Sequence, residues 1–252
     1  MVKIDLSNRL AVVTGASGEL GRAMVRVLGE AGADVAVHYH RNAAQAEKLR
    51  DELTALGRRA VAVQADVTRL DSVLAMRDAI AGALGEPDII VNNSVIQYQW
   101  THVLDQAPED YEGQFRSCVL HNVFMAKAFV PAMIRRKWGR VIAISTECAM
   151  QNVPNQSAYV SGKRGMDGVL RVLAREVGEH GITVNQVAPG WTASENRPDG
   201  DLHESYRQRV PLRRRGKDRD IAHAVAFLAS DLAGFITGVY LPVCGGNVMP
   251  AI

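Results

Sequence analysis

Short apolar runs rich in β-branched residues alternate with longer helical patterns along the whole chain. The apolar runs lie at 10–14, 34–39, 60–66, 88–93, 140–146 and 182–188, and the helical patterns lie near 19–31, 42–56, 69–84, 107–137 and 157–179. The runs lack polar alternation, which is typical of parallel strands covered by helices on both faces. This βαβ rhythm predicts a doubly wound α/β domain. A further run at 239–243 predicts a seventh strand, and Pro242 favours an edge strand or the end of a strand.

Length and composition limit the class of protein further. The chain has 252 residues, of which 47% are hydrophobic and 22% charged, so we expect one globular domain over residues 1–252. A formal net charge of +2 gives no overall attraction to nucleic acid or to an anionic membrane, and we expect neither as a partner. The three cysteines are too few for a disulfide framework, and residues 1–17 lack a long apolar leader, which together predict a cytoplasmic protein.

One polar region, residues 191–217, interrupts the regular pattern in the C-terminal third of the chain. It contains prolines and glycines among many charged residues. Long insertions of this kind in compact domains often form lids or binding loops. We therefore expect 191–217 to be a substrate-binding loop region.

The first apolar run leads directly into TGASGELG, residues 14–21, and then into a helical pattern. In this arrangement backbone N–H groups and a helix N-terminus can receive a pyrophosphate. We expect Gly15, Ser17, Gly18 and Gly21 to contact that group. The alternative is an ordinary glycine turn, because many strands are followed by one and the GxGxxG spacing is absent. No P-loop sequence occurs, which disfavours a P-loop nucleotide hydrolase.

The residues at the end of the second run, His38 to Asn42, include no carboxylate. In a dinucleotide-binding fold this position reads the adenosine ribose, and an NAD site places an acidic side chain there. The guanidinium and imidazole groups suit a 2′-phosphate instead. The sequence therefore predicts NADPH or NADP+ rather than NADH, with contacts from Tyr39, His40, Arg41 and Asn42. The alternative is a basic helix start exposed to solvent.

Tyr159 and Lys163 are four residues apart at the start of a helical pattern, so they lie on one face of that helix. Reduction of a carbonyl needs a proton donor, and a phenol with an ordinary pKa of about 10 is a poor one unless its anion is stabilised. A neighbouring ammonium lowers the pKa of a phenol. The pair predicts a catalytic acid and its helper. An amphipathic helix face is the alternative for this common spacing.

Six segments, taken together in their order and spacing, are highly specific. They are TGASGELG (14–21), Asp66-Val67, VNNSV (91–95), YVSGK (159–163), TVNQVAPGW (183–191) and ITGVYLPVCGG (236–246). In these segments the chain resembles the short-chain dehydrogenase/reductase family, in its 3-oxoacyl-(acyl-carrier-protein)-reductase-like branch. The resemblance implies a single Rossmann domain with a seven-stranded parallel sheet and helices on both faces. It also implies an NAD(P)(H) cofactor and a homo-tetramer or homo-dimer.

The resemblance implies roles for individual residues as well. Tyr159 would be the general acid/base. Lys163 would bind the nicotinamide ribose and lower the pKa of Tyr159. Asp66 would hold the adenine amino group. Further cofactor contacts are implied for Val67, for Asn92 at the ribose, and for Pro189 and Gly190 beside the nicotinamide.

Two departures from the family pattern affect the cofactor cradle and the floor of the site. Glu19 stands where the family has a glycine, and a carboxylate there repels a pyrophosphate unless it turns outward. Val95 replaces a second family glycine, which permits close approach of the backbone. We therefore expect a reshaped floor at Val95.

Two further departures lie at catalytic positions. Thr146 takes the place of the family's substrate-orienting serine, and its hydroxyl can still donate to a carbonyl oxygen, so we predict it as catalytic. Strand alternation points the neighbouring Ser145 to the opposite face. Cys118 takes the place of the helix asparagine that completes a proton relay to the lysine. His121 or Asn122, about one helical turn further on, is the alternative for that role.

Several large apolar side chains follow the C-terminal ends of the predicted strands, where ligands bind in open α/β sheets. We expect an apolar substrate pocket lined by Val95, Tyr98, Trp100, Met150 and Trp191. The alternative is ordinary packing or a subunit contact. Cys118 and His121 share a helix face but lack two further ligands at suitable spacing, so we expect no metal site.

The sequence thus predicts an NADPH-dependent oxidoreductase that acts on a small-molecule carbonyl or secondary alcohol. The alternative, suggested by the changes at positions 19, 95, 118 and 146, is a catalytically lapsed family member that binds NADP(H) as a sensor or scaffold. The retained pair of Tyr159 and Lys163 favours the enzyme, because a sensor has no chemical need for a proton donor.

Overall fold

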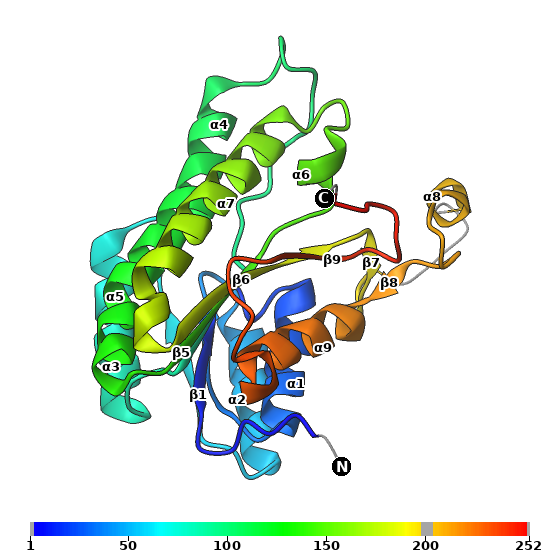
Figure 1. The fold of residues 1–252 in the computed structure, drawn as a ribbon. Coiled ribbons are helices and arrows are strands. Elements are labelled where there is room, and N and C mark those ends of the chain that lie inside the picture. Colours follow the sequence, from blue (N-terminus) through cyan, green and yellow to red (C-terminus); the bar gives the residue numbers. More distant parts are fainter. Residues whose placement is uncertain (1–2, 198–203, 251–252) are drawn as a thin grey trace.

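A single parallel sheet forms the centre of the protein. The computed structural model describes residues 3–197 and 204–250. The seven strands follow the order β3-β2-β1-β4-β5-β6-β9, and every neighbouring pair is parallel. Figure 1 shows the sheet between helices on its two sides. Their bounds are β1 Leu10–Val13, β2 Asp34–Tyr39, β3 Ala60–Gln64, β4 Ile89–Asn92, β5 Gly139–Ile144, β6 Ile182–Pro189 and β9 Tyr240–Val243. The strand order reverses between β1 and β4, and ligands bind outside the carboxyl ends of the strands at such a reversal.

Helices cover both faces of the sheet, as the sequence predicted. One face packs against α1 (Glu19–Glu30), α2 (Ala43–Ala55) and α9 (Asp218–Ala229). The other packs against α3 (Leu70–Ala83), α5 (His121–Arg136) and α7 (Ser157–Val177). Strand alternation divides the core between the faces, since Ala11 and Val13 of β1 belong to one cluster and Leu10 and Val12 to the other. The predicted single α/β Rossmann domain is therefore confirmed.

Several smaller elements were not predicted. Helix α9 follows the polar region and closes one face of the sheet. The continuous helical pattern at 107–137 is divided into α4 (Pro108–Gln114), a π-helix η1 (Phe115–Leu120) and α5. The remaining short elements are α6 (Cys148–Gln151), α8 (Glu204–Arg209), and the 3-10 turns η2 (Gly178–His180) and η4 (Asp231–Ala233).

The two ends of the polar region lie against each other. Strand β7 (Thr192–Ala193) pairs in parallel with β8 (Gly216–Lys217), which closes the region at its base. Residues 191–217 are thus a tied insertion rather than a plain loop; its residues 198–203 lie outside the described part of the chain. Strand β9 lies at the edge of the sheet and contains Pro242, as expected from the sequence.

One helical stretch in the described part of the chain, Pro108–Arg136, is long and apolar enough to cross a membrane by length and composition. Of its most apolar window, 61% is buried inside the protein. A core helix of a soluble protein passes the same test, so this stretch is weak evidence for a membrane span.

Candidate active site

The glycine turn between β1 and α1 is shaped for close approach of a ligand. Gly15 has a φ of +61°, which favours glycine. A Cβ at Gly21 would lie 2.2 Å from the Gly15 carbonyl oxygen, so the helix can meet the turn only with glycine there. Gly18 is the N-cap of α1, and no side chain caps the helix. The first N–H groups of α1 are therefore left for an anion.

His38 holds this turn from the neighbouring strand. It is buried, and its Nδ1 accepts a hydrogen bond from the Gly15 N–H at 2.9 Å, while its Nε2 donates to the Ala65 carbonyl at 3.1 Å. Burial lowers the pKa of His38 to about 4, so the ring is neutral at pH 7. The sequence counted this imidazole among the groups that suit a 2′-phosphate. The structure corrects that expectation, because both ring nitrogens are used inside the fold.

The rest of this segment, residues 39–42, includes two exposed basic side chains. His40 and Arg41 are exposed, and Arg41 forms no ion pair within the described residues. Asn42 caps α2 by accepting from the Gln45 N–H at 3.2 Å, whereas Tyr39 packs partly buried against the core. The segment contains no acidic side chain, which is what a 2′-phosphate site requires.

Asp66 and Val67 follow β3 at the edge of the sheet where the carboxyl ends of the strands lie. Asp66 Oδ1 accepts from the Thr68 N–H at 2.9 Å and from the Thr68 hydroxyl at 2.6 Å. Burial tends to raise the pKa of Asp66, but these hydrogen bonds outweigh it and the pKa is lowered. Asp66 is therefore ionised at neutral pH and can accept from an amino group. Val67 is buried.

The two asparagines at the end of β4 take different partners. Asn92 is buried, and its amide nitrogen donates to Asn122 Oδ1 at 2.7 Å, while its Oδ1 has no hydrogen-bond partner among the described residues. Asn93 instead reaches the glycine turn and donates to the carbonyls of Thr14 and Gly15 at 3.0 and 3.1 Å. The family resemblance implied a ribose contact for Asn92, and that role stays a prediction.

Tyr159 and Lys163 lie on one face of α7, next to the carboxyl end of β5. Lys163 is buried, and its Nζ donates to the Ile144 carbonyl at 2.6 Å. The same nitrogen lies 5.7 Å from the centre of the Tyr159 ring. Burial lowers the pKa of Lys163 below its usual range. An ammonium has three N–H donors, so Lys163 can bind a ligand hydroxyl while it holds the Ile144 carbonyl.

Thr146 joins this pair through its side chain. Burial raises the pKa of Tyr159 above its usual range, and a hydrogen bond from Thr146 partly offsets that rise. We expected the Lys163 ammonium to lower this pKa; in the structure burial outweighs every stabilising contact, so Tyr159 is a protonated phenol at neutral pH. Ser145 donates to the Tyr240 hydroxyl at 2.9 Å and takes no part in this group of contacts.

The π-helix η1 brings Cys118 close to the same place. Cys118 is buried, and its Sγ lies 3.7 Å from Gln114 Oε1. The Cys118 carbonyl accepts from Asn122 Nδ2 at 2.7 Å, which connects it to Asn92 through the Asn122 amide. His121 is buried and donates from Nδ1 to the Ser117 carbonyl at 3.1 Å, and burial lowers its pKa to about 3. Asn122, rather than His121, therefore supports the peptide at Cys118.

Two of the expected pocket residues contact Tyr159 directly. The Tyr98 hydroxyl accepts a hydrogen bond from the Tyr159 N–H at 2.7 Å. The Trp100 ring stacks on the Tyr159 ring, with the ring centres 6.0 Å apart and the planes inclined by 23°. Met150 lies partly buried on α6. Val95 instead packs against the core.

Trp191 lies at the start of the tied insertion, just after Pro189 and Gly190. It packs edge-on to Tyr206, with the ring centres 5.5 Å apart, and the Arg215 guanidinium lies 5.4 Å from the centre of the Trp191 ring. The Tyr206 hydroxyl accepts from the Trp191 N–H at 2.8 Å and donates to Glu147 Oε1 at 3.1 Å. The insertion is thus anchored beside the reaction site.

Sequence reasoning missed Glu147, which follows Thr146. It is a buried carboxyl that accepts from Tyr206 and, at 3.0 Å, from Asn247 Nδ2. Burial raises its pKa above the usual range. An acidic residue directly after a buried strand was the available signal. Among residues 3–197 and 204–250, no group of three or more His, Cys, Asp or Glu side chains is placed to hold a metal ion.

Comparison with known proteins agrees with this geometry. A family model described as enoyl-(acyl carrier protein) reductase matches residues 15–247. The 3-oxoacyl-(acyl-carrier-protein) reductase of Staphylococcus epidermidis is 36% identical over 254 residues, which covers 96% of this chain and 100% of that protein. The enzyme of the same name from Pseudomonas aeruginosa is also 36% identical and covers 98% of this chain and 100% of its own.

Solved structures of similar proteins have the same fold. A mutant short-chain dehydrogenase/reductase of Serratia marcescens superposes with a TM-score of 0.88 at 30% identity, covering 96% of this chain and 98% of its own. A blue fluorescent protein from a metagenomic library, solved in complex with NADPH, superposes with a TM-score of 0.89 at 33% identity, covering 97% and 100%. The chain therefore belongs to the short-chain dehydrogenase/reductase family, and within it is similar to the 3-oxoacyl-(acyl-carrier-protein) reductases.

Proposed function

We propose that this protein is an NADPH-dependent oxidoreductase that interconverts a carbonyl and a secondary alcohol, with Tyr159 as the general acid/base. The observation that carries the proposal is the set of contacts around the Tyr159 phenol. The Thr146 side chain is near enough to lower its pKa, the Lys163 ammonium lies near its ring, and Trp100 stacks on it. A structural tyrosine would not need beside it a buried ammonium that has no carboxylate partner among residues 3–197 and 204–250.

The residues present fit a dinucleotide that carries a 2′-phosphate. The uncapped start of α1 leaves backbone N–H groups for an anion, and Gly21 lets the helix lie close against the turn at Gly15. Asp66 is an ionised acceptor for an adenine amino group, and the exposed Arg41 has no carboxylate to neutralise it among the described residues. When bound, the reduced nicotinamide supplies a hydride.

The protein's own groups supply the proton and orient the substrate. The Thr146 hydroxyl donates a hydrogen bond to the substrate carbonyl oxygen. Tyr159, whose raised pKa keeps it protonated at neutral pH, transfers its proton to the same oxygen as negative charge develops there. Lys163 stabilises the resulting phenolate through its positive charge. In the oxidative direction the same phenol, once deprotonated, acts as the base.

The substrate class follows from the walls of the site. Tyr98 and Trp100 come from the segment after β4, and Met150 and Trp191 come from the segments after β5 and β6. These side chains favour a ketone or alcohol with an apolar body. Because two relatives are named 3-oxoacyl-(acyl-carrier-protein) reductases, 3-oxoacyl thioesters are the first substrates to examine.

The decisive experiment compares the parent protein with Tyr159→Phe. We expect turnover of any accepted ketone to fall by at least about 10², because general acid catalysis contributes that much, while NADPH affinity stays within a few-fold. Lys163→Ala should impair both. Activity that Tyr159→Phe leaves intact refutes the mechanism. Tight NADPH binding without turnover of any ketone or alcohol supports the alternative of a lapsed enzyme that acts as a sensor.

We also propose that the protein forms a homo-dimer or homo-tetramer. Phe115 and Val172 are 52% and 55% exposed on the outer side of the helices that cover one face of the sheet. A cavity of about 690 Å³ lies between η1 and α7 and includes Phe115 and Gly165 in its walls. A second copy of the same surface would cover these apolar groups. Light scattering of the parent and of Phe115→Arg tests this assembly.

All cysteines are free, in line with a reducing compartment, and we place the protein in the cytoplasm.

A further inference from the structure

Glu19, the carboxylate that stands where the family has a glycine, makes most of its contacts with a distant part of the chain. Ser194 and Arg197 close a tight turn, in which the Ser194 N–H donates to the Arg197 carbonyl at 3.0 Å and the reverse bond measures 3.1 Å. Within this turn the Ser194 hydroxyl donates to Glu19 at 2.6 Å, and Asn196 donates to it from Nδ2 at 2.9 Å and from its N–H at 3.4 Å.

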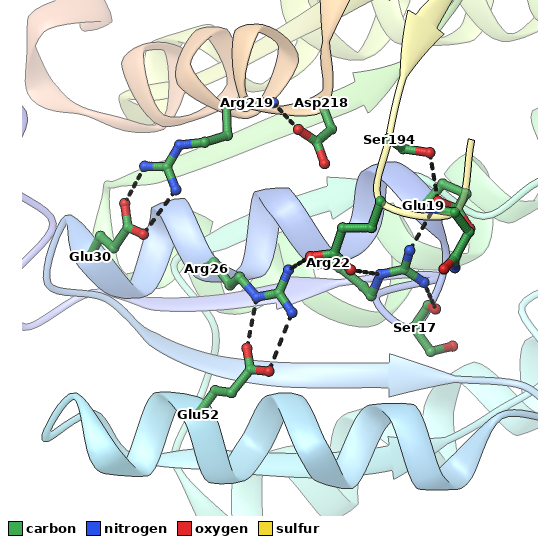
Figure 2. Close-up of polar contacts among 11 residues, drawn as sticks. Ser17, Glu19, Arg22, Arg26, Glu30, Glu52, Ser194, Asp218 and Arg219 are labelled. Carbon is green, nitrogen blue, oxygen red and sulfur yellow. Dashed lines mark hydrogen bonds and ion pairs between the residues drawn. The ribbon is translucent and has the colours of Figure 1, made fainter. Parts of the chain in front are cut away.

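Ion pairs connect the same turn to the next two turns of α1. Arg22 donates from Nη2 to Glu19 at 2.9 Å (Figure 2). The Nε of Arg22 lies 3.0 Å from Glu195 Oε2. Arg26 pairs with Glu195 as well and also with Glu52 of α2, at 2.7 Å. Negative and positive side chains therefore alternate from the start of α1 across the turn and on to α2.

This arrangement explains how a carboxylate can occupy the first position of α1. Burial tends to raise the pKa of Glu19, but the hydrogen bonds from Ser194 and Asn196, together with the charge of Arg22, lower it. The carboxylate is thus ionised, its charge is balanced by Arg22, and three donors of the turn hold it. Its lone pairs are directed at protein donors, so the repulsion expected from the sequence is largely offset.

We propose that Glu19 is a positioning residue that latches the turn 194–197 onto the N-terminus of α1 in the free protein. The turn continues from Pro189 and Gly190 at the end of β6, so the latch connects the glycine cradle with the segment beside the reaction site. This inference rests on the proposed function for its link to the cofactor. Because the segment is already ordered, cofactor binding does not bear the entropic cost of ordering it.

The latch and simple charge repulsion make opposite predictions for the cofactor. If Glu19 mainly repelled a pyrophosphate, its removal would tighten NADPH binding. If Glu19 mainly orders the turn, removal of its carboxylate weakens NADPH binding, even though the family itself has no carboxylate at this position. The sign of the change therefore decides between the two.

The experiment begins with hydrogen exchange on the free protein and needs no ligand. We expect Glu19→Ala to speed exchange of the N–H groups of Ser194 and Arg197 by about tenfold, because the hydrogen bonds that these two residues exchange form only while the turn is closed. Ser194→Ala approaches the same contact from the other side and should act in the same direction. The matched control is Glu30→Ala, which removes an ion pair with Arg219 at the far end of the same helix and should leave residues 190–197 unchanged.

Titration with NADPH follows on the same variants. We expect the Kd to rise by about five- to tenfold for Glu19→Ala, as for the loss of one charge-assisted contact, and to stay constant for Glu30→Ala. Unchanged exchange at 190–197 in both Glu19→Ala and Ser194→Ala overturns the latch. Faster exchange with an unchanged or tighter Kd overturns its role in cofactor binding. If the parent binds no nicotinamide nucleotide, the proposed function fails, and the exchange data still decide whether the latch exists.

Discussion

The Trp100 ring stacks on the Tyr159 ring, with the ring centres 6.0 Å apart. The residues belong to different segments, one after β4 and the other at the start of α7. The backbone N–H of Tyr159 also donates to the Tyr98 hydroxyl, so two aromatic residues of one segment hold the same tyrosine. The segment after β4 therefore positions the proposed acid as well as lining the substrate pocket.

Trp100→Ala should lower kcat/KM for apolar ketones by about three- to tenfold, because an aromatic pair contributes about 0.5–1.5 kcal/mol beyond its buried area. Trp100→Phe keeps a stacking ring and should retain most of the activity. Steady-state kinetics of both variants test this. Equal losses in the two variants would show that the stacking contact does not position Tyr159.

Thr146→Val should lower kcat by about 10² or more, because it removes a hydroxyl aimed at the developing charge while keeping the shape of the side chain. Thr146→Ser retains the hydroxyl and should stay within a few-fold of the parent. Neither change should alter the Kd of NADPH appreciably. A Val variant as active as the Ser variant would remove Thr146 from the mechanism.

Arg41→Ala should weaken NADPH binding by about ten- to a hundredfold and leave NADH binding nearly unchanged, because a charge-assisted hydrogen bond contributes about 1.5–3 kcal/mol. Arg175→Ala, at an exposed position in the last turn of α7, is the control for a general loss of positive charge. Both variants are titrated with both cofactors. Equal affinity of the parent for NADH and NADPH would contradict the assignment.

Acid should destabilise the protein through its buried histidines before most carboxylates titrate. Burial lowers the pKa of His38 from 6.5 to about 4, so the unfolded state binds a proton more readily than the folded state, and stability is lost as pH falls from 6.5 towards 4. Between about pH 7 and pH 5.5 the loss amounts to about 1 kcal/mol for His38, and His121, with a pKa of about 3, adds a similar amount.

Urea unfolding of the parent between about pH 7 and pH 5.5 measures this loss. His38→Asn keeps an acceptor near the Gly15 N–H but does not titrate there, so the stability of this variant should change by about 1 kcal/mol less than that of the parent over that range. An equal pH dependence in parent and variant would show that His38 is not the group responsible.

The helices and strands of the central sheet and its covering layers could be predicted from the local hydrophobic pattern of the sequence. Continuous apolar runs and the intervening helices predicted every strand of the central sheet to within a few residues, since burial on both faces demands apolar side chains at every strand position. The spacing of Tyr159 and Lys163 placed both on one helix face because residues four apart lie one turn from each other. The π-helix at 115–120 was not readable, because its extra residue per turn leaves no distinct periodicity in so short a stretch.

The sequence by itself thus determined the parallel sheet, its covering helices, the glycine cradle and the pairing of Tyr159 with Lys163. Only the tertiary structure decided which partners the polar side chains take. Glu19 meets Ser194 across 175 positions of the chain, and His38 binds Gly15 and Ala65 from two directions. Local periodicity specifies which face of an element is buried, whereas hydrogen bonds between distant residues depend on how those faces pack in three dimensions.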